Sequence, residues 1–149
     1  MKVNTKSSIT QPKYRFVPLA DVYNESLEVQ WLIEDYIPAQ SVGMIYGPSG
    51  AGKSHIAFDM AVCIANGIDW CDKATKKGHI LIMAGEGHNG LNRRLKSIEK
   101  VRNVDIDVTK ISISERAIGI DSDKTMQEIV NAIGTLSNVP DLIIIDLYP

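Results

Sequence analysis

Residues 47–54 read GPSGAGKS, and this stretch decides how the rest of the chain is interpreted. It matches the pattern G-x-x-x-x-G-K-[ST], with Gly47, Gly52, Lys53 and Ser54 at the defining positions. Glycines let a loop curl so that successive backbone N–H groups point inward at phosphate oxygens. We therefore predict a phosphate-binding loop, the P-loop, made of Gly47, Pro48, Ser49, Gly50, Ala51, Gly52, Lys53 and Ser54.

The residues on both sides of the P-loop fit this interpretation. The apolar run at 42–46 predicts a strand that enters the loop, and "HIAFDMAVCIA" predicts a helix over 53–66. A helix that begins at the loop adds its free N–H groups and the positive end of its dipole to an anion site. Lys53 can reach the β- and γ-phosphates of ATP, and the Ser54 hydroxyl can bind Mg²⁺. The alternative is a glycine-rich turn with an accidental lysine, and the flanking strand and helix argue against it.

The rest of the chain alternates between strand and helix patterns. Strands are predicted at 79–84 (HILIMA), 110–114 (KISIS) and 142–146 (LIIID), and helices at 91–101 and 126–136, where apolar residues recur at helical spacing. The segment 16–38 predicts a short lead-in helix or an edge strand. This order predicts an α/β fold, a three-layer α-β-α arrangement with a mostly parallel sheet.

Two carboxylates are candidates for metal binding and catalysis beside the P-loop. Asp146 ends the apolar strand LIIID, so it emerges at the carboxyl edge of the sheet, where ligands bind in open α/β sheets. A metal ligand is needed there, and we predict that Ser54 and Asp146 hold the metal. Glu86 follows the strand at 79–84 between two glycines and could orient the water that attacks the γ-phosphate. A solvent-exposed turn glutamate is the alternative for Glu86, and a surface histidine is the default for the neighbouring His88.

Composition limits the remaining possibilities. The chain has 149 residues, 44% hydrophobic and 23% charged, with a net charge of −2, which suits one globular domain without an overall basic field. Cys63 and Cys71 lack metal-ligand spacing and are expected to be reduced. Residues 1–15 are polar and basic and are predicted to be a mobile arm. With neither a signal-peptide core nor an apolar run of the ~20 residues that span a membrane, we expect a cytoplasmic protein.

Basic residues gather on the predicted helix at 91–101 and in the turn before the strand at 79–84. Two interpretations stay open for them, a solvated face or a contact with nucleic acid or another subunit. They are Lys73, Lys76, Lys77, Arg93, Arg94, Lys96, Lys100 and Arg102.

The motifs "MIYGPSGAGKS", "GHILIMAGEGHNGLNRRL" and "DLIIID" occur in an order that resembles the RecA-like ATPases of the RepA replicative-helicase type. The resemblance runs from about residue 19 to the end of the sequence. It implies that Lys53 and Ser54 are the P-loop lysine and metal-side hydroxyl, that Glu86 is the catalytic glutamate and that Asp146 is the Walker B aspartate. It also implies ATP hydrolysis coupled to single-stranded DNA, usually in a hexameric ring.

The sequence departs from this family by stopping three residues after Asp146. The family continues with a strand between the P-loop strand and the Walker B strand, with DNA-facing loops and with an arginine finger. We therefore expect residues 16–149 to be the N-terminal part of a RecA-like core, with Lys53 and Glu86 as catalytic residues but little turnover. Two alternatives are a P-loop kinase and a non-catalytic nucleotide-binding remnant that acts through a partner subunit.

Overall fold

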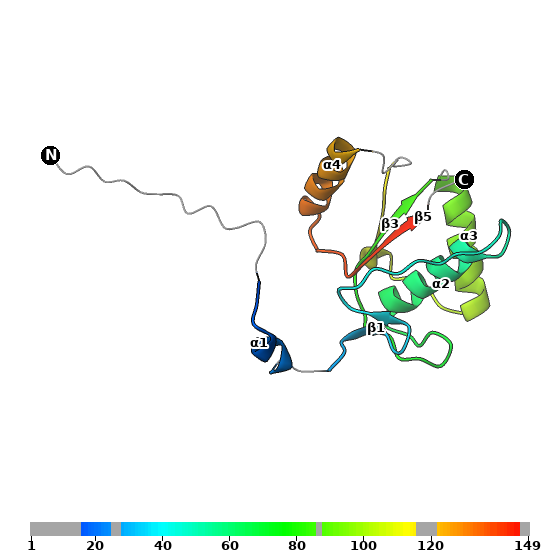
Figure 1. Ribbon diagram of the computed structural model, residues 1–149. Coiled ribbons are helices and arrows are strands. Elements are labelled where there is room, and N and C mark those ends of the chain that lie inside the picture. The colour runs from blue at the N-terminus through cyan, green and yellow to red at the C-terminus, as the bar shows by residue number, and fades with distance from the viewer. Residues whose placement is uncertain (1–15, 25–27, 86–87, 116–121, 147–149) are drawn as a thin grey trace.

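The computed structural model describes residues 16–24, 28–85, 88–115 and 122–146 (Figure 1). Its helices are α1 (Leu19–Tyr23), α2 (Lys53–Asn66), α3 (His88–Arg102) and α4 (Asp123–Gly134), and a short 3-10 turn, η1, covers Val108–Lys110. Its strands are β1 (Trp31–Ile33), β2 (Ile37–Pro38), β3 (Ile80–Ala84), β4 (Ile111–Ile113) and β5 (Leu142–Asp146). The helix predicted at 53–66 and the strand predicted at 142–146 are confirmed.

The main sheet has three parallel strands in the order β4-β3-β5. Strand β3 is central, and its register with β5 runs from Ile80 opposite Leu142 to Ala84 opposite Asp146. Helix α3 connects β3 to β4, and α4 lies between β4 and β5 in the chain. Parallel neighbours need such crossovers, so the alternation of strands and helices produces the predicted α/β sheet.

Helices cover both faces of this sheet (Figure 1). Side chains of a strand alternate between its faces, so Ile80 and Ile82 of β3 pack with α2 and α3, whereas Leu81 and Met83 pack with Ile129 of α4. All five residues of β3 are buried, as expected for a strand covered on both sides. The predicted three-layer α-β-α arrangement of a P-loop NTPase is confirmed.

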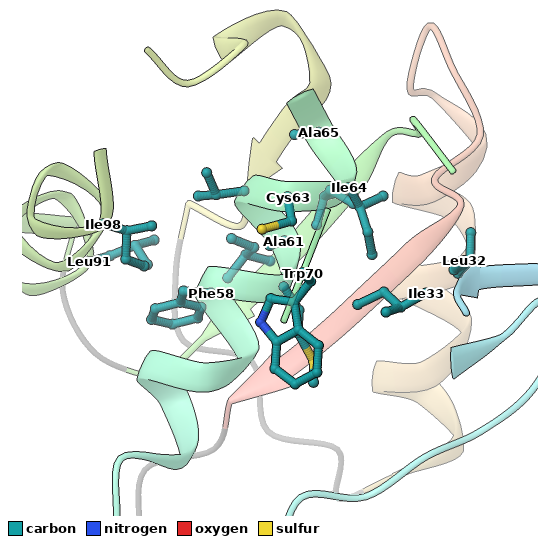
Figure 2. Packing of buried hydrophobic residues seen from close by; sticks show 14 of the residues in the cluster. Leu32, Ile33, Phe58, Ala61, Cys63, Ile64, Ala65, Trp70, Leu91 and Ile98 are labelled. Carbon is teal, nitrogen blue, oxygen red and sulfur yellow. The ribbon is translucent and has the colours of Figure 1, made fainter. Parts of the chain in front are cut away.

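Helix α2 is the centre of the larger core (Figure 2). Its side chains Phe58 and Ile64 are fully buried, with Leu91 and Ile98 of α3 in the same cluster. The helix stops at Gly67, whose φ of 69° is left-handed and whose N–H is bonded to Ile64 O. The burial of α2 on several sides fixes where its first turn lies, and that turn carries the P-loop lysine and serine.

The segment before the P-loop forms more than the single lead-in element that the pattern predicted. It contains α1, in which no residue is buried, and an antiparallel hairpin of β1 and β2. Leu32 and Ile33 of the hairpin are buried in the α2 core, and Tyr36 meets Trp70 edge-to-face with ring centroids 5.0 Å apart. The hairpin therefore adds two buried side chains to the core around α2.

The strand predicted at 42–46 is absent, and that prediction is wrong for the structure. These residues, named here the approach segment, form no strand, and Val42, Met44 and Tyr46 are exposed. A strand is stable where a neighbour pairs with its N–H and C=O groups. In the part of the chain that the structure describes, no strand lies beside the approach segment, and β5 pairs with β3 alone. Within the described ranges, the apolar side chains of the approach segment have no surface to pack on.

The two cysteines are free, as predicted. Cys63 is buried in α2, and burial raises the pKa of its thiol to about 11, whereas Cys71 is exposed. None of the described helices has the length and apolar character needed to cross a membrane. The predicted arm at 1–15 lies outside the described residues.

Candidate nucleotide-binding site

The structure brings together two motifs that lie 92 residues apart in the sequence. Ser54 stands in the first turn of α2, and Asp146 is the last residue of β5. The Ser54 hydroxyl Oγ donates to Asp146 Oδ1 at 3.0 Å, in a partly buried contact. The residues predicted to share a metal therefore lie within hydrogen-bond distance, at the carboxyl edge of the sheet.

The P-loop curls at two glycines with left-handed backbones. Gly50 has φ 77° and Gly52 has φ 82°, backbone conformations that residues other than glycine rarely adopt. Gly52 is the N-cap of α2, and no side chain among the described residues caps this helix end. The first N–H groups of any helix have no partner within it, so this end is suited to an anion.

Lys53 turns back over the loop. Its Nζ donates to Gly47 O at 3.0 Å and to Pro48 O at 2.9 Å. These bonds hold the ammonium group against the backbone of Gly47 and Pro48, and Ala51 N donates to Pro48 O at 3.3 Å. The lysine charge therefore stays beside the loop glycines, where the phosphates of a nucleotide would approach.

The ends of β3 and β5 are tied together beside this loop. Gly85 N donates to Asp146 O at 2.7 Å, one residue beyond the last paired position of β3. This bond places the exit of β3 at the same edge as the Asp146 carboxylate. Glu86 lies outside the described residues, so its predicted role stays a prediction. His88 begins α3, and its side chain also lies outside the described part.

An ion pair that the sequence did not reveal holds α2 against α3. Arg102, the last residue of α3, donates from Nε to Asp59 Oδ1 and from Nη2 to Asp59 Oδ2, the latter at 2.6 Å. Trp70 Nε1 donates to the same Asp59 Oδ2 at 2.9 Å. The hydrogen bonds from Arg102 hold the pKa of the Asp59 carboxyl below its usual value, and the same bonds raise the pKa of Arg102. This triad anchors the middle of α2, and so supports the P-loop at its start.

The donor set at the sheet edge suits Mg²⁺. Mg²⁺ prefers oxygen ligands and is commonly held by one or two carboxylates together with substrate phosphates and water. Ser54 Oγ and Asp146 Oδ1 are two such oxygens, 3.0 Å apart. Among the described residues no group of three or more His, Cys, Asp or Glu side chains could hold a metal by itself. The residues fit an ion that arrives with a nucleotide better than a permanent structural metal.

A family model described as an AAA domain matches residues 10–148, almost the whole chain. No curated protein and no solved structure matches the chain.

Proposed function

We propose that this chain, which belongs to the AAA domain family, binds ATP at residues 47–54 and hydrolyses it. The single observation that supports this most is the 3.0 Å hydrogen bond between Ser54 and Asp146. It joins the hydroxyl that ends the P-loop motif to a strand-end carboxylate, and a P-loop ATPase needs these two groups side by side.

Each residue has a distinct part in the proposed site. The backbone of the loop and the N-terminus of α2 bind the phosphates. The Lys53 ammonium group exchanges its two carbonyl partners for oxygens of the β- and γ-phosphates. Ser54 and Asp146 hold Mg²⁺, which neutralises charge on the phosphates when it is bound. Glu86, directly after β3, orients the attacking water and accepts its proton.

We further propose an ATPase of the RepA replicative-helicase type, a cytoplasmic protein that assembles into a ring and couples hydrolysis to single-stranded DNA. The order of the three motifs supports this finer assignment, with Lys53, Glu86 and Asp146 in the positions that the resemblance implies. The kinase alternative finds no specific support in the site.

Calorimetric titration with MgATP tests the binding step. Lys53→Ala should weaken binding by about 1.5–3 kcal/mol, because a charge-assisted contact to phosphate is lost. Lys76→Ala is the matched control, an exposed lysine outside residues 47–54, and should bind as the wild type does. Equal affinity of wild type and Lys53→Ala would refute the assignment of the P-loop.

A metal comparison tests Asp146 separately. Asp146→Asn should weaken binding of MgATP, and the difference from wild type should disappear in EDTA, because the carboxylate acts through the ion.

Phosphate release with and without single-stranded DNA then tests the catalytic step, with Glu86→Gln as the variant that keeps binding and loses turnover. If a phosphorylated small molecule forms in place of free phosphate, the chain is a kinase and the proposal fails.

A further inference from the structure

The sequence contains two asparagines that are directly followed by glycine, Asn66-Gly67 and Asn89-Gly90. An asparagine in this position can react with its own backbone. The nitrogen of the next residue attacks the side-chain carbonyl carbon, and a five-membered succinimide ring forms as ammonia leaves. Glycine permits this attack most readily because it has no Cβ to obstruct ring closure. The two pairs share the same local chemistry, so the fold decides whether each of them reacts.

The fold holds the Asn66 side chain by both of its polar atoms. Asn66 Nδ2 donates to Asp105 O at 2.7 Å, and Asn66 Oδ1 accepts from Asp107 N at 3.0 Å. The attacking nitrogen is also engaged, because Gly67 N donates to Ile64 O at 3.3 Å. Asn66 is half-buried at the end of α2. Ring closure at this pair therefore requires the end of α2 to separate from all of these partners.

Asn89 lies in a different environment, in the first turn of α3. Its side chain is exposed, and its amide forms no hydrogen bond with any other residue that the structure describes. Because α3 begins at His88, the N–H of Gly90 is one of the first N–H groups of the helix, which have no acceptor within it. The end of a helix also opens at a much lower free energy than a packed element does. Ring closure at Asn89 therefore needs only a local opening of α3.

From this difference we infer that Asn89-Gly90 is a modification site, at which the chain deamidates spontaneously, and that the fold protects Asn66-Gly67. Gly90 N forms a bond to Asn89 Cγ, and the bond between Cγ and Nδ2 breaks. The Nδ2 nitrogen leaves as ammonia with the proton of Gly90 N. Water, the co-reactant, then opens the ring at one of its two carbonyl carbons. The product is aspartate, or isoaspartate with the backbone running through the former side chain.

Each product changes the start of α3 in its own way. Aspartate adds a negative charge to the first turn, where the helix dipole favours it. Isoaspartate adds one carbon to the backbone two residues before Leu91, which is buried in the α2 core, so it disturbs the packing of α3. Glu86 precedes Asn89 by three residues, and a loss of turnover on ageing rests on the proposed function. The deamidation itself does not depend on that function, so the two proposals can fail separately.

Peptide mapping of the full chain tests the inference. The protein is incubated in water enriched in oxygen-18, either folded or in guanidinium chloride, and is then cleaved with trypsin in ordinary water. Trypsin separates the two pairs into the peptides 54–73 and 78–93, and each deamidated product carries one oxygen-18. In the folded chain, residue 89 should react at least tenfold faster than residue 66, because two side-chain hydrogen bonds have to open first at residue 66. In guanidinium chloride the two rates should agree within about twofold, since the local sequence alone then decides.

Two controls separate the glycine from simple exposure. Asn92 is exposed on the same helix but is followed by Arg93, so it should stay unmodified within the same peptide. Gly90→Ala should slow the reaction at residue 89 at least tenfold, because the new Cβ obstructs the attack. Circular dichroism checks that this variant is folded. The inference is overturned if residue 66 reacts as fast as residue 89 in the folded chain, or if residue 89 reacts only in guanidinium chloride.

Discussion

The two stretches that flank the P-loop are similar in composition and opposite in environment. After the loop, Phe58 and residues 60–65 of α2 are buried between the sheet, α3 and the hairpin. Before it, the approach segment is just as apolar, yet Val42 and Tyr46 are almost fully exposed, at 101% and 88%. Both stretches are rich in apolar residues, so the neighbouring elements decide whether those residues are buried.

The largest effect on stability is expected in α2, the buried stretch after the P-loop. Phe58→Ala should lower the free energy of unfolding by about 3–5 kcal/mol, because a fully buried ring is replaced by a cavity between α2 and α3. Tyr46→Ala, an aromatic of the approach segment, should change it by less than about 0.5 kcal/mol. Urea unfolding followed by circular dichroism measures both. Similar losses in the two variants would mean that both stretches are packed.

The next largest effect is expected from the ion pair between Asp59 and Arg102, which joins α2 to α3. Arg102→Ala should cost about 1.5–3 kcal/mol of unfolding free energy, because Asp59 loses two charge-assisted hydrogen bonds. Arg93→Ala, an exposed arginine of the same helix, is the control and should be nearly neutral.

The pH dependence of this effect has a definite sign. Because the folded-state pKa of Asp59 is lowered, the contribution is present above its unfolded value of about 3.9 and is lost as pH falls through the folded-state pKa. Wild type and Arg102→Ala should therefore converge in stability below about pH 4. Asp107, whose pKa is lowered to about 2 by Thr109 and Lys77, is present in both proteins and cancels in the difference. A gap that stays constant with pH would contradict the ion-pair interpretation.

The same contrast explains which features could be predicted from the sequence. Helix 53–66 was predictable because its apolar residues are followed by Gly67, and strand 142–146 because it is a continuous apolar run that ends in a carboxylate. Ser54 and Asp146 could be paired because both motifs end at one sheet edge. The ion pair between Asp59 and Arg102 joins residues 43 apart, and no local sequence pattern predicts it. The strand prediction for the approach segment was wrong because the segment has the apolar pattern of a strand, but a strand also needs a paired neighbour. Local sequence does not specify that neighbour.

Backbone conformation gives a smaller effect. Gly67→Ala should cost about 1–2 kcal/mol, because the left-handed φ of 69° disfavours a side chain and the new Cβ would lie 3.0 Å from Lys77 Cβ. Gly43→Ala in the approach segment should cost almost nothing, since a Cβ there meets no atom within 4 Å and the backbone is not left-handed. Thermal unfolding of the two variants provides the comparison. Equal shifts would show that Gly43 is as constrained as the end of α2.

The smallest expected effect is the one that tests the approach segment itself. Met44 is 86% exposed, so Met44→Ser removes a side chain that packs on nothing among the described residues, and the free energy of unfolding should change by less than about 0.5 kcal/mol. Ile82→Ser is the matched comparison, an apolar residue with 0% exposure in β3. Hydrogen exchange adds a second measure, because amides of an unpaired segment should exchange far faster than those of β3. A loss of 1–2 kcal/mol in Met44→Ser, together with slow exchange at 42–46, would show that the segment is paired and buried in solution. The predicted strand would then exist, and the open edge of β5 would be the first place to look for its neighbour.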